Sequence, residues 1–379
     1  MSSEFIIFIR DFAIFFGIHL IVALSLNLEY GYAGVPNFGK VLAVAGGAFT
    51  AAIVPGRLIA GIFGVGVGLD YIDSNTAVVT AINAFLQGNP VVSLVMFFST
   101  LVIAAAVGAA LGLLASYPAI RLREDYLSIT LLAMGEAIYV IGYNFQPLLK
   151  GTIGVMVPDP FRWAGDLRYQ ILLACVLGIG VVIFLYLERL VNTPLGRMLR
   201  AIRDNEQVAD ALGKRVTSIR MKTITLASAI GAIAGAIDAF KSGGIIATMY
   251  RRVTWTFWPW VIVVLGGPAN NKGVVLGTFV YTLLRRVIDY YKGEFEAFVP
   301  FSVYWLHSLL LGILLIAILI YRPEGLLRER PIKTLNYTRI RGQLLGSAGA
   351  EAPSWRQRLR DRVAQWKRAL QGAVRRQRS

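Results

Sequence analysis

Long apolar runs alternate with short polar segments along most of the chain. Most runs have about 20 residues, enough for an α-helix to cross a hydrocarbon core of roughly 30 Å. The run at residues 255–265 is shorter; we expect a full crossing there, with a re-entrant half-helix as the alternative. The pattern predicts an all-α polytopic membrane protein, a bundle of about 8–10 transmembrane helices. The predicted spans are residues 12–28, 38–54, 91–114, 126–141, 171–187, 221–240, 255–265, 274–288 and 303–321.

The distribution of charge predicts how these helices are oriented. The 379 residues are 56% hydrophobic and carry a formal net charge of +16. The cations concentrate in residues 188–222 and 322–379, which positive-inside topology explains better than a nucleic-acid-binding surface. We therefore expect both segments in the cytoplasm, the amino terminus outside, and no nucleic acid as a partner.

Two details do not fit this topology. Arg251 and Arg252 fall on the outer side, against the positive-inside rule. The apolar, glycine-rich residues 61–69 could form a further partial crossing, which would change the side of the amino terminus.

The polar segment after the fifth predicted span has the pattern of two short helices. Thr193 can cap the first helix, and Pro194 suits its first turn. Asp204 or Asn205 can cap the second helix, which Gly213 ends. The apolar faces consist of Leu195, Leu199 and Ile202 in the first helix and of Val208, Ala211 and Leu212 in the second.

Such a pair of helices forms a compact plug, which suits docking into a groove on a cytoplasmic partner. A helix lying on lipid headgroups is the alternative. The residues expected to carry the docking are Arg197, Leu199, Arg200, Ile202, Arg203, Asp204, Glu206, Ala211 and Gly213.

The final part of the chain, residues 328–379, is a basic tail. Apolar residues recur there at three- and four-residue spacing, with arginines and Lys367 on the other faces: Trp355, Leu359, Val363, Trp366, Leu370 and Val374. This pattern predicts a basic amphipathic helix on the anionic lipid of the inner leaflet, with a partly disordered charge run as the alternative.

Glu136 is the most informative charge inside a predicted span. It lies ten residues after Tyr126, where an ionised carboxylate is costly unless it faces the bundle interior, a cation or water. We expect it to line a solute pathway or to brace a broken helix. The alternatives are a structural salt bridge or a position nearer the membrane interface than these span limits suggest.

The residue types that usually carry catalysis do not form a recognisable site. His19 and His307 are far apart in the sequence, and Cys175 is the only cysteine. Residues 34–40 fit the first seven positions of a phosphate-binding loop, but Val41 lacks the hydroxyl that would bind Mg²⁺. We expect no enzymatic activity, no metal and no cofactor in this chain.

Several motifs together resemble one transporter family. The segment TPLGRMLRAIRDNE, residues 193–206, is similar to the cytoplasmic coupling loop of LivH/LivM-type permeases of branched-chain amino acid ABC transporters. The resemblance covers residues 24–326 but neither the basic tail nor the insert at residues 59–89. Its other motifs are LNLEYGYAG at 26–34, DYLSIT at 125–130 with Gly135 and Glu136, VLGG at 264–267 and YRPEGL at 321–326.

The resemblance implies that residues 1–327 form a transmembrane permease domain, with residues 188–222 as its coupling loop. Such a domain is one half of an importer pore in the cell membrane, for branched-chain or other small aliphatic amino acids. The implied partners are a second permease subunit, two cytoplasmic ATPase subunits that bind the ATP, and an extracytoplasmic solute-binding protein.

Two departures from the family pattern leave other solutes open. Residues 37–40 read NFGK where the family usually has SLGH, and residues 150–154 read KGTIG where it has a glycine pair before Gly-Leu or Gly-Ile. The alternatives are urea, short amides or another small polar solute, or, in a different class, an ion-coupled secondary transporter. The candidate pathway residues are Asn37, Lys40, Thr130, Glu136, Gly266 and Gly267.

Overall fold

The computed structural model describes residues 3–66, 68–120, 122, 124–296, 305–322 and 324–329. The chain divides into two compact units, Met1–Arg330 and Pro331–Ser379. The second unit, which includes the predicted amphipathic helix of the tail, lies outside the described residues. The fold below is that of the first unit.

Helices dominate the described residues, and two short strands form one antiparallel pair, Val155–Met156 (β1) with Gly244–Ile245 (β2). The α-helices are α1 Ser3–Leu26, α2 Lys40–Phe63, α3 Asn75–Gly88, α4 Pro90–Ser116, α5 Glu124–Asn144, α6 Gln146–Leu149, α7 Arg168–Val191, α8 Pro194–Asp204, α9 Glu206–Ala211, α10 Val216–Ser242, α11 Trp258–Gly266, α12 Asn271–Tyr290, α13 Lys292–Glu296 and α14 Leu306–Tyr321. The π-helices are η1 Asn27–Tyr32 and η5 Val253–Phe257, and the 3-10 helices are η2 Tyr117–Ile120, η3 Arg162–Leu167 and η4 Ala247–Met249.

Six helical segments of the described residues are long and apolar enough to cross a membrane. They are Phe5–Tyr32, Lys40–Phe63, Pro90–Ser116, Tyr126–Asn144, Arg162–Val191 and Val216–Ser242, and they coincide with the first six predicted spans. The prediction of an all-α polytopic membrane protein is confirmed. The other three predicted spans fall on α11, α12 and α14, which are shorter or more polar.

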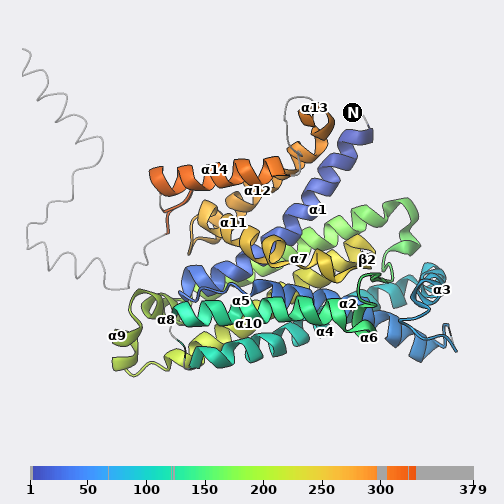
Figure 1. Cartoon of the computed structure of the whole chain (residues 1–379), viewed down its shortest axis with the longest axis horizontal. Helices are drawn as coiled ribbons and strands as arrows, with labels where there is room; N and C mark the ends of the chain where they lie inside the picture. Colours follow the sequence, from blue (N-terminus) through green and yellow to red (C-terminus); the bar gives the residue numbers. More distant parts are fainter. Residues whose placement is uncertain are drawn as a thin grey trace, which may run out of the picture. The chain divides into compact units, whose positions relative to one another are not determined.

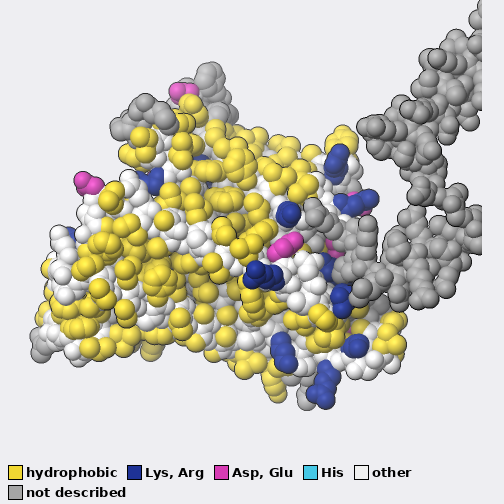
Figure 2. Space-filling view, turned by 180° about the vertical axis from the view of Figure 1, so that it is seen from behind, with side chains coloured by type: hydrophobic (Ala, Val, Ile, Leu, Met, Phe, Trp, Pro, Cys, Tyr) yellow, Lys and Arg dark blue, Asp and Glu magenta, His cyan; other side chains and the backbone are white. Residues whose placement is uncertain are grey.

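The two ends of the bundle differ in what they carry. α8 and α9 lie together at one end, and α3 with the β1–β2 pair lies at the other (Figure 1). Seen from behind, hydrophobic side chains cover most of the middle, whereas lysines and arginines gather toward the α8–α9 end, on the right in that view (Figure 2). An apolar middle with basic residues gathered at one end is typical of a membrane protein, whose middle faces lipid and whose basic end faces water.

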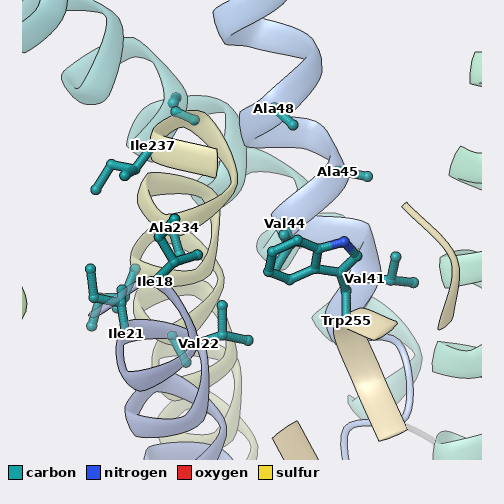
Figure 3. Close-up of a cluster of buried hydrophobic side chains, with 14 of the residues drawn as sticks. Ile18, Ile21, Val22, Val41, Val44, Ala45, Ala48, Ala234, Ile237 and Trp255 are labelled. Atoms are coloured by element: carbon teal, nitrogen blue, oxygen red, sulfur yellow. The ribbon is translucent and has the colours of Figure 1, made fainter. Parts of the chain in front are cut away.

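The centre of the bundle is formed by α1, α2 and α10. Figure 3 shows isoleucines and valines of α1 beside small residues of α2 and α10, with Trp255 reaching between them. The helices approach so closely that an added Cβ at Gly47 or at Gly235 would lie 1.9 Å from a backbone oxygen of the facing helix. Small residues at such contacts let membrane helices pack backbone to backbone.

The crossing after α10 is only partly an α-helix. α10 ends at Ser242, and the chain then passes through β2, η4 and η5 before α11 begins. The Tyr250 hydroxyl donates to the Asp238 carboxylate at 3.0 Å, and the Trp255 indole N–H donates to the Met249 carbonyl oxygen at 3.1 Å. This run is not among the six segments long and apolar enough to cross a membrane, so the full crossing at residues 255–265 stays a prediction.

The insert between the second and third predicted spans does not contain the partial crossing considered for residues 61–69. α2 continues through Pro55 to Phe63, and the described residues 64–66 and 68–74 form turns. The Tyr71 hydroxyl donates to the Ala52 carbonyl oxygen at 2.7 Å and fixes these turns to α2. α3 follows at the β1–β2 end and packs there through Asn75, whose side chain accepts from the Met156 N–H at 2.6 Å.

Candidate functional site

α8 and α9 form the predicted pair of short helices at one end of the bundle. Pro194 occupies the first turn of α8, but the Thr193 side chain does not cap it. Its hydroxyl instead donates to the Leu190 carbonyl oxygen at 2.6 Å, so the predicted capping role is wrong. Asn205 caps α9 by accepting from the Val208 N–H at 3.0 Å. Gly213 follows α9 with φ +74°, the left-handed conformation that often ends a helix.

The two apolar faces of this pair point to different surroundings. Leu199 and Ile202 of α8, both expected to dock on a partner, are buried against the bundle and offer no surface to one, whereas Leu195 on the same predicted face is 38% exposed. Val208 of α9 is 53% exposed, and Leu212 directly after α9 is 72% exposed. The surface that remains open for a partner is therefore on and next to α9, together with exposed Arg197, Ala211 and Gly213.

The arginines of α8 hold the helix to the bundle. Arg203 donates to the Gly31 carbonyl oxygen of η1 at 2.7 Å, and Arg200 lies over the Tyr32 ring at 4.9 Å. Burial lowers the pKa of Arg203, but the carboxylates of Glu329 and Asp204 outweigh it and raise that pKa above its ordinary value. Arg203 therefore remains charged, and α8 is attached to the end of the first membrane helix.

A second attachment joins α8 to the segment of residues 324–329. Glu329 pairs with Arg200 at 2.9 Å and with Arg203 at 3.0 Å. On the other side, the N–H groups of Leu326 and Leu327 donate to the Leu265 and Gly266 carbonyl oxygens at 2.9 and 3.0 Å. The 324–329 segment thus connects α8 to the end of α11. Glu206 ties α9 to the first turns of α10 through Arg220, at 2.7 Å.

Gly266 and Gly267, both predicted pathway residues, lie in this junction. An added Cβ at Gly266 would be 2.3 Å from the Gly273 carbonyl oxygen, and one at Gly267 would be 2.2 Å from the Leu327 carbonyl oxygen. Gly267 also has φ +109°, which side chains rarely adopt. Their contacts explain why glycine is needed there: the backbones of α11, α12 and the 324–329 segment meet.

Asn37 and Lys40, also predicted to line the pathway, lie in the bundle interior. The Lys40 ammonium is 3.0 Å from the Glu29 carboxylate, and neither side chain has exposed surface. Asn37 donates to the other Glu29 oxygen at 3.2 Å, and Lys40 also donates to the Ala227 carbonyl oxygen at 3.1 Å. In this conformation these groups bind one another and offer no surface to a solute.

Glu29 was not among the predicted site residues. The available signal was a carboxylate and a lysine eleven positions apart at the junction of two apolar spans, where each would be costly alone. A second missed network lies nearby: Asn27 accepts from the Ala269 N–H at 2.9 Å and donates to Asn271 at 3.0 Å. It ties the start of η1 to the start of α12.

Glu136 is a predicted pathway residue whose carboxylate remains partly exposed. Its carboxylate is 3.6 Å from the Arg252 guanidinium, and the two side chains are 42% and 46% exposed. Arg251 lies over the Tyr139 ring at 5.6 Å. The two arginines that seemed to break the positive-inside rule therefore contact α5, and both remain exposed. Thr130 of α5 donates to its own helix, at the Tyr126 carbonyl oxygen.

The remaining reactive residue types do not assemble into a catalytic arrangement. The His19 ring is buried beside Phe15, Trp255 and Tyr281, at centroid distances of 3.9, 5.4 and 5.5 Å. No group of three or more His, Cys, Asp or Glu that could hold a metal occurs among the residues that the structure describes. Residues 150–154 lie at the β1–β2 end, where Lys150 donates to the Asp73 carbonyl oxygen at 2.7 Å.

These features together define a polytopic membrane transport permease: apolar helices, a half-exposed ion pair among them, and a charged helical pair at one end. Comparison with known proteins agrees with this class. The family described as branched-chain amino acid transport system / permease component matches residues 8–319. The chain belongs to that family, and the LivM-type resemblance seen in its motifs is confirmed.

The chain is 41% identical over 325 residues to the probable branched-chain amino acid transport permease protein LivM of Methanocaldococcus jannaschii, which covers 85% of this chain and 93% of the relative. It is 28% identical over 256 residues to the high-affinity branched-chain amino acid transport system permease protein LivM of Escherichia coli, covering 61% and 57%. It is 26% identical over 225 residues to the ribose import permease protein RbsC of Escherichia coli, covering 59% and 68%. No solved structure matches the chain significantly.

Proposed function

We propose that the chain forms half of the translocation pathway of an ATP-driven importer of branched-chain or other small aliphatic amino acids. The observation that carries the proposal is the double attachment of α8, to η1 through Arg203 and to the end of α11 through Glu329. A helix that only connected two spans would need neither attachment. The names of the two LivM relatives support the substrate class.

The partners would be a second permease subunit, two ATPase subunits and a solute-binding protein. The ATPases would bind the nucleotide, so this chain would need no cofactor and hydrolyse nothing itself. The exposed apolar side chains of Val208 and Leu212 suit docking into a groove on an ATPase subunit.

Coupling would then work as a rigid-body movement. When the ATPase grooves move on ATP binding, α9 and α8 would move with them. Arg203 would transfer the movement to the corner between η1 and α2, and Glu329 would transfer it to α11. The corner between η1 and α2 would then shift together with α11, and this movement would open or close the pathway to solute.

The same proposal orients the protein in the cell membrane. The α8–α9 end, where the lysines and arginines gather, would face the cytoplasm, and the amino terminus would lie outside. The basic tail would then also be cytoplasmic, within reach of anionic lipid on the inner leaflet.

Another solute class remains as a second candidate, because one relative is named for ribose import. A small polar solute such as urea or a short amide would use the same architecture. The charges of Glu136 and Arg252 favour an amino acid over these neutral solutes, as developed below.

The test is to purify the tagged chain from mild detergent and identify the proteins that accompany it. We expect two ATPases and a second permease, and we expect Val208→Glu with Leu212→Glu to remove the ATPases alone. Ile153→Glu, an equally exposed apolar residue at the β1–β2 end, is the matched control and should keep them. A chain that purifies alone would contradict the proposal and favour a secondary transporter.

A further inference from the structure

Glu136 and Arg252 form a loose ion pair between two different elements. Glu136 lies on α5, and Arg252 lies just before η5 in the discontinuous crossing. Their charged groups are 3.6 Å apart, beyond the roughly 2.7–2.9 Å of a charge-assisted hydrogen bond. By contrast, the Glu29–Lys40 pair is 3.0 Å apart and neither side chain is exposed, as in a fully formed buried ion pair.

The pair lies close to the middle of the membrane. The candidate span that contains Glu136 begins at Tyr126, ten residues earlier, which corresponds to about 15 Å along a helix. A hydrocarbon core is roughly 30 Å thick, so Glu136 and its partner lie near its midplane. Two charged side chains that are nearly half exposed at this depth cannot face lipid without a large cost. They must face water or protein.

The surroundings of the pair combine charge with aliphatic surface. Arg251 lies over the Tyr139 ring and adds a second guanidinium next to Arg252. Val140 follows Glu136 by one helical turn and is 47% exposed, and Val253 follows Arg252 directly and is 49% exposed. The site therefore offers one carboxylate, two guanidinium groups and exposed apolar side chains.

We propose that Glu136 and Arg252 bind a zwitterionic α-amino acid in the pathway, Glu136 accepting from its ammonium group and Arg252 donating to its carboxylate. The two partners exchange their mutual contact for those of the solute, so no charge is left unpaired while the solute is bound. A solute with a single charge would leave one partner unpaired, and a neutral solute would make hydrogen bonds to the pair without the attraction between opposite charges. This inference rests on the proposed function and names the groups that recognise the substrate.

The assembled importer, reconstituted into liposomes with its binding protein, allows a direct test with labelled L-leucine as the probe. Glu136→Gln and Arg252→Gln should each lower the uptake rate by roughly tenfold to a hundredfold, because each removes a hydrogen bond between charged groups. The ATP hydrolysis rate and the subunit composition should not change. Glu136→Asp and Arg252→Lys should retain part of the uptake.

Asp159→Asn is the matched control, because Asp159 pairs with Arg168 at 3.2 Å at the β1–β2 end, with 23% and 39% exposure. It should leave uptake unchanged. The charge exchange Glu136→Arg with Arg252→Glu distinguishes a solute-binding site from a structural ion pair. If the pair only holds the two elements together, the exchanged pair should restore uptake. If it binds an L-amino acid, uptake should stay impaired, because the charges have changed places relative to the aliphatic surface.

The outcomes separate the two proposals. Absence of leucine, isoleucine and valine uptake by the unmodified complex would refute the proposed substrate class and the site with it. Normal uptake by the unmodified complex and by both glutamine variants would refute the site alone. Recovery of uptake or of assembly on charge exchange would also refute the site, since the pair would then be a structural brace.

Discussion

The Glu29 carboxylate and the Lys40 ammonium meet at 3.0 Å in the interior of the bundle, with no exposed surface on either side chain. They close the corner at which the chain turns from η1 into α2, and Lys40 also reaches the Ala227 carbonyl oxygen of α10. Arg203 of α8 contacts the same corner through the Gly31 carbonyl oxygen. The ion pair therefore makes this corner a firm joint between α8 and the centre of the bundle.

Removal of one partner of this pair should destabilise the protein strongly. Glu29→Gln or Lys40→Met leaves a buried group unpaired, and we expect a loss of about 3–5 kcal/mol in the free energy of unfolding. The double variant Glu29→Leu with Lys40→Met should recover most of that loss, because both charges are gone. Thermal unfolding of the purified chain measures the effect. A double variant as unstable as the single ones would show that the charges themselves are not the cause.

Gly47 should tolerate no side chain, because an added Cβ would lie 1.9 Å from the Ala232 carbonyl oxygen. Gly47→Ala forces α2 and α10 apart, which we expect to cost about 1–3 kcal/mol or more. Gly178→Ala in α7 is the control, since nothing lies within 4 Å of its added Cβ. Equal melting temperatures for the two variants would contradict the close packing of α2 on α10.

Glu329→Gln should separate ATP hydrolysis from transport. It weakens the two ion pairs with Arg200 and Arg203, so α8 would keep its attachment to η1 and lose its attachment to α11. In the reconstituted complex we expect ATP hydrolysis to continue while uptake falls several-fold. Glu324→Gln is the control, because Glu324 pairs with Arg328 where both side chains are more than half exposed. The same loss of uptake in both variants would argue against a specific role for Glu329.

The basic tail should bind membranes through charge. A peptide of residues 350–379 should bind vesicles that contain anionic phosphatidylglycerol, with roughly 1 kcal/mol for each basic residue near the surface, and high salt should release it. A peptide with glutamine in place of the arginines should bind weakly. Equal binding to neutral phosphatidylcholine vesicles, or binding that ignores salt, would refute the electrostatic anchor. Co-sedimentation measures both.

Local pattern was sufficient for the features that depend on neighbours in the sequence. The spacing of Leu199 and Ile202 predicted the α8 helix, although these side chains were expected to contact a partner and instead pack on the bundle, and Gly213 ends the second short helix as predicted. The apolar runs predicted the six long spans because an α-helix satisfies all of its backbone hydrogen bonds within one segment of the sequence. The other three predicted spans correspond to α11, α12 and α14, whose ends depend on contacts with other parts of the chain.

Contacts between distant residues could not be predicted in this way. Lys40 was expected near a solute because residues 37–40 depart from the family pattern and place a cation there. The sequence pattern did not indicate that Glu29 pairs with it. Arg252 was counted as a loop cation on the outer side because its partner Glu136 lies far away in the sequence, on another helix. Gly266 and Gly267 were predicted to be pathway residues, although Gly266 packs against the backbone of α12 at Gly273 and Gly267 packs against the 324–329 segment, about 60 residues later.

The discontinuous crossing also has a consequence for biosynthesis. η5 and α11 form one helical run over residues 252–266, roughly 20 Å long, which is shorter than a hydrocarbon core of roughly 30 Å and too short to be released into lipid as an independent membrane segment. The backbone of residues 243–251, before this helical run, is not α-helical and needs hydrogen-bond partners that lipid does not supply. This part of the chain must therefore wait at the insertion machinery until α1, α2 and α10 have assembled to receive it. Mutations that loosen those three helices should lead to degradation during synthesis, before the importer could be tested for transport.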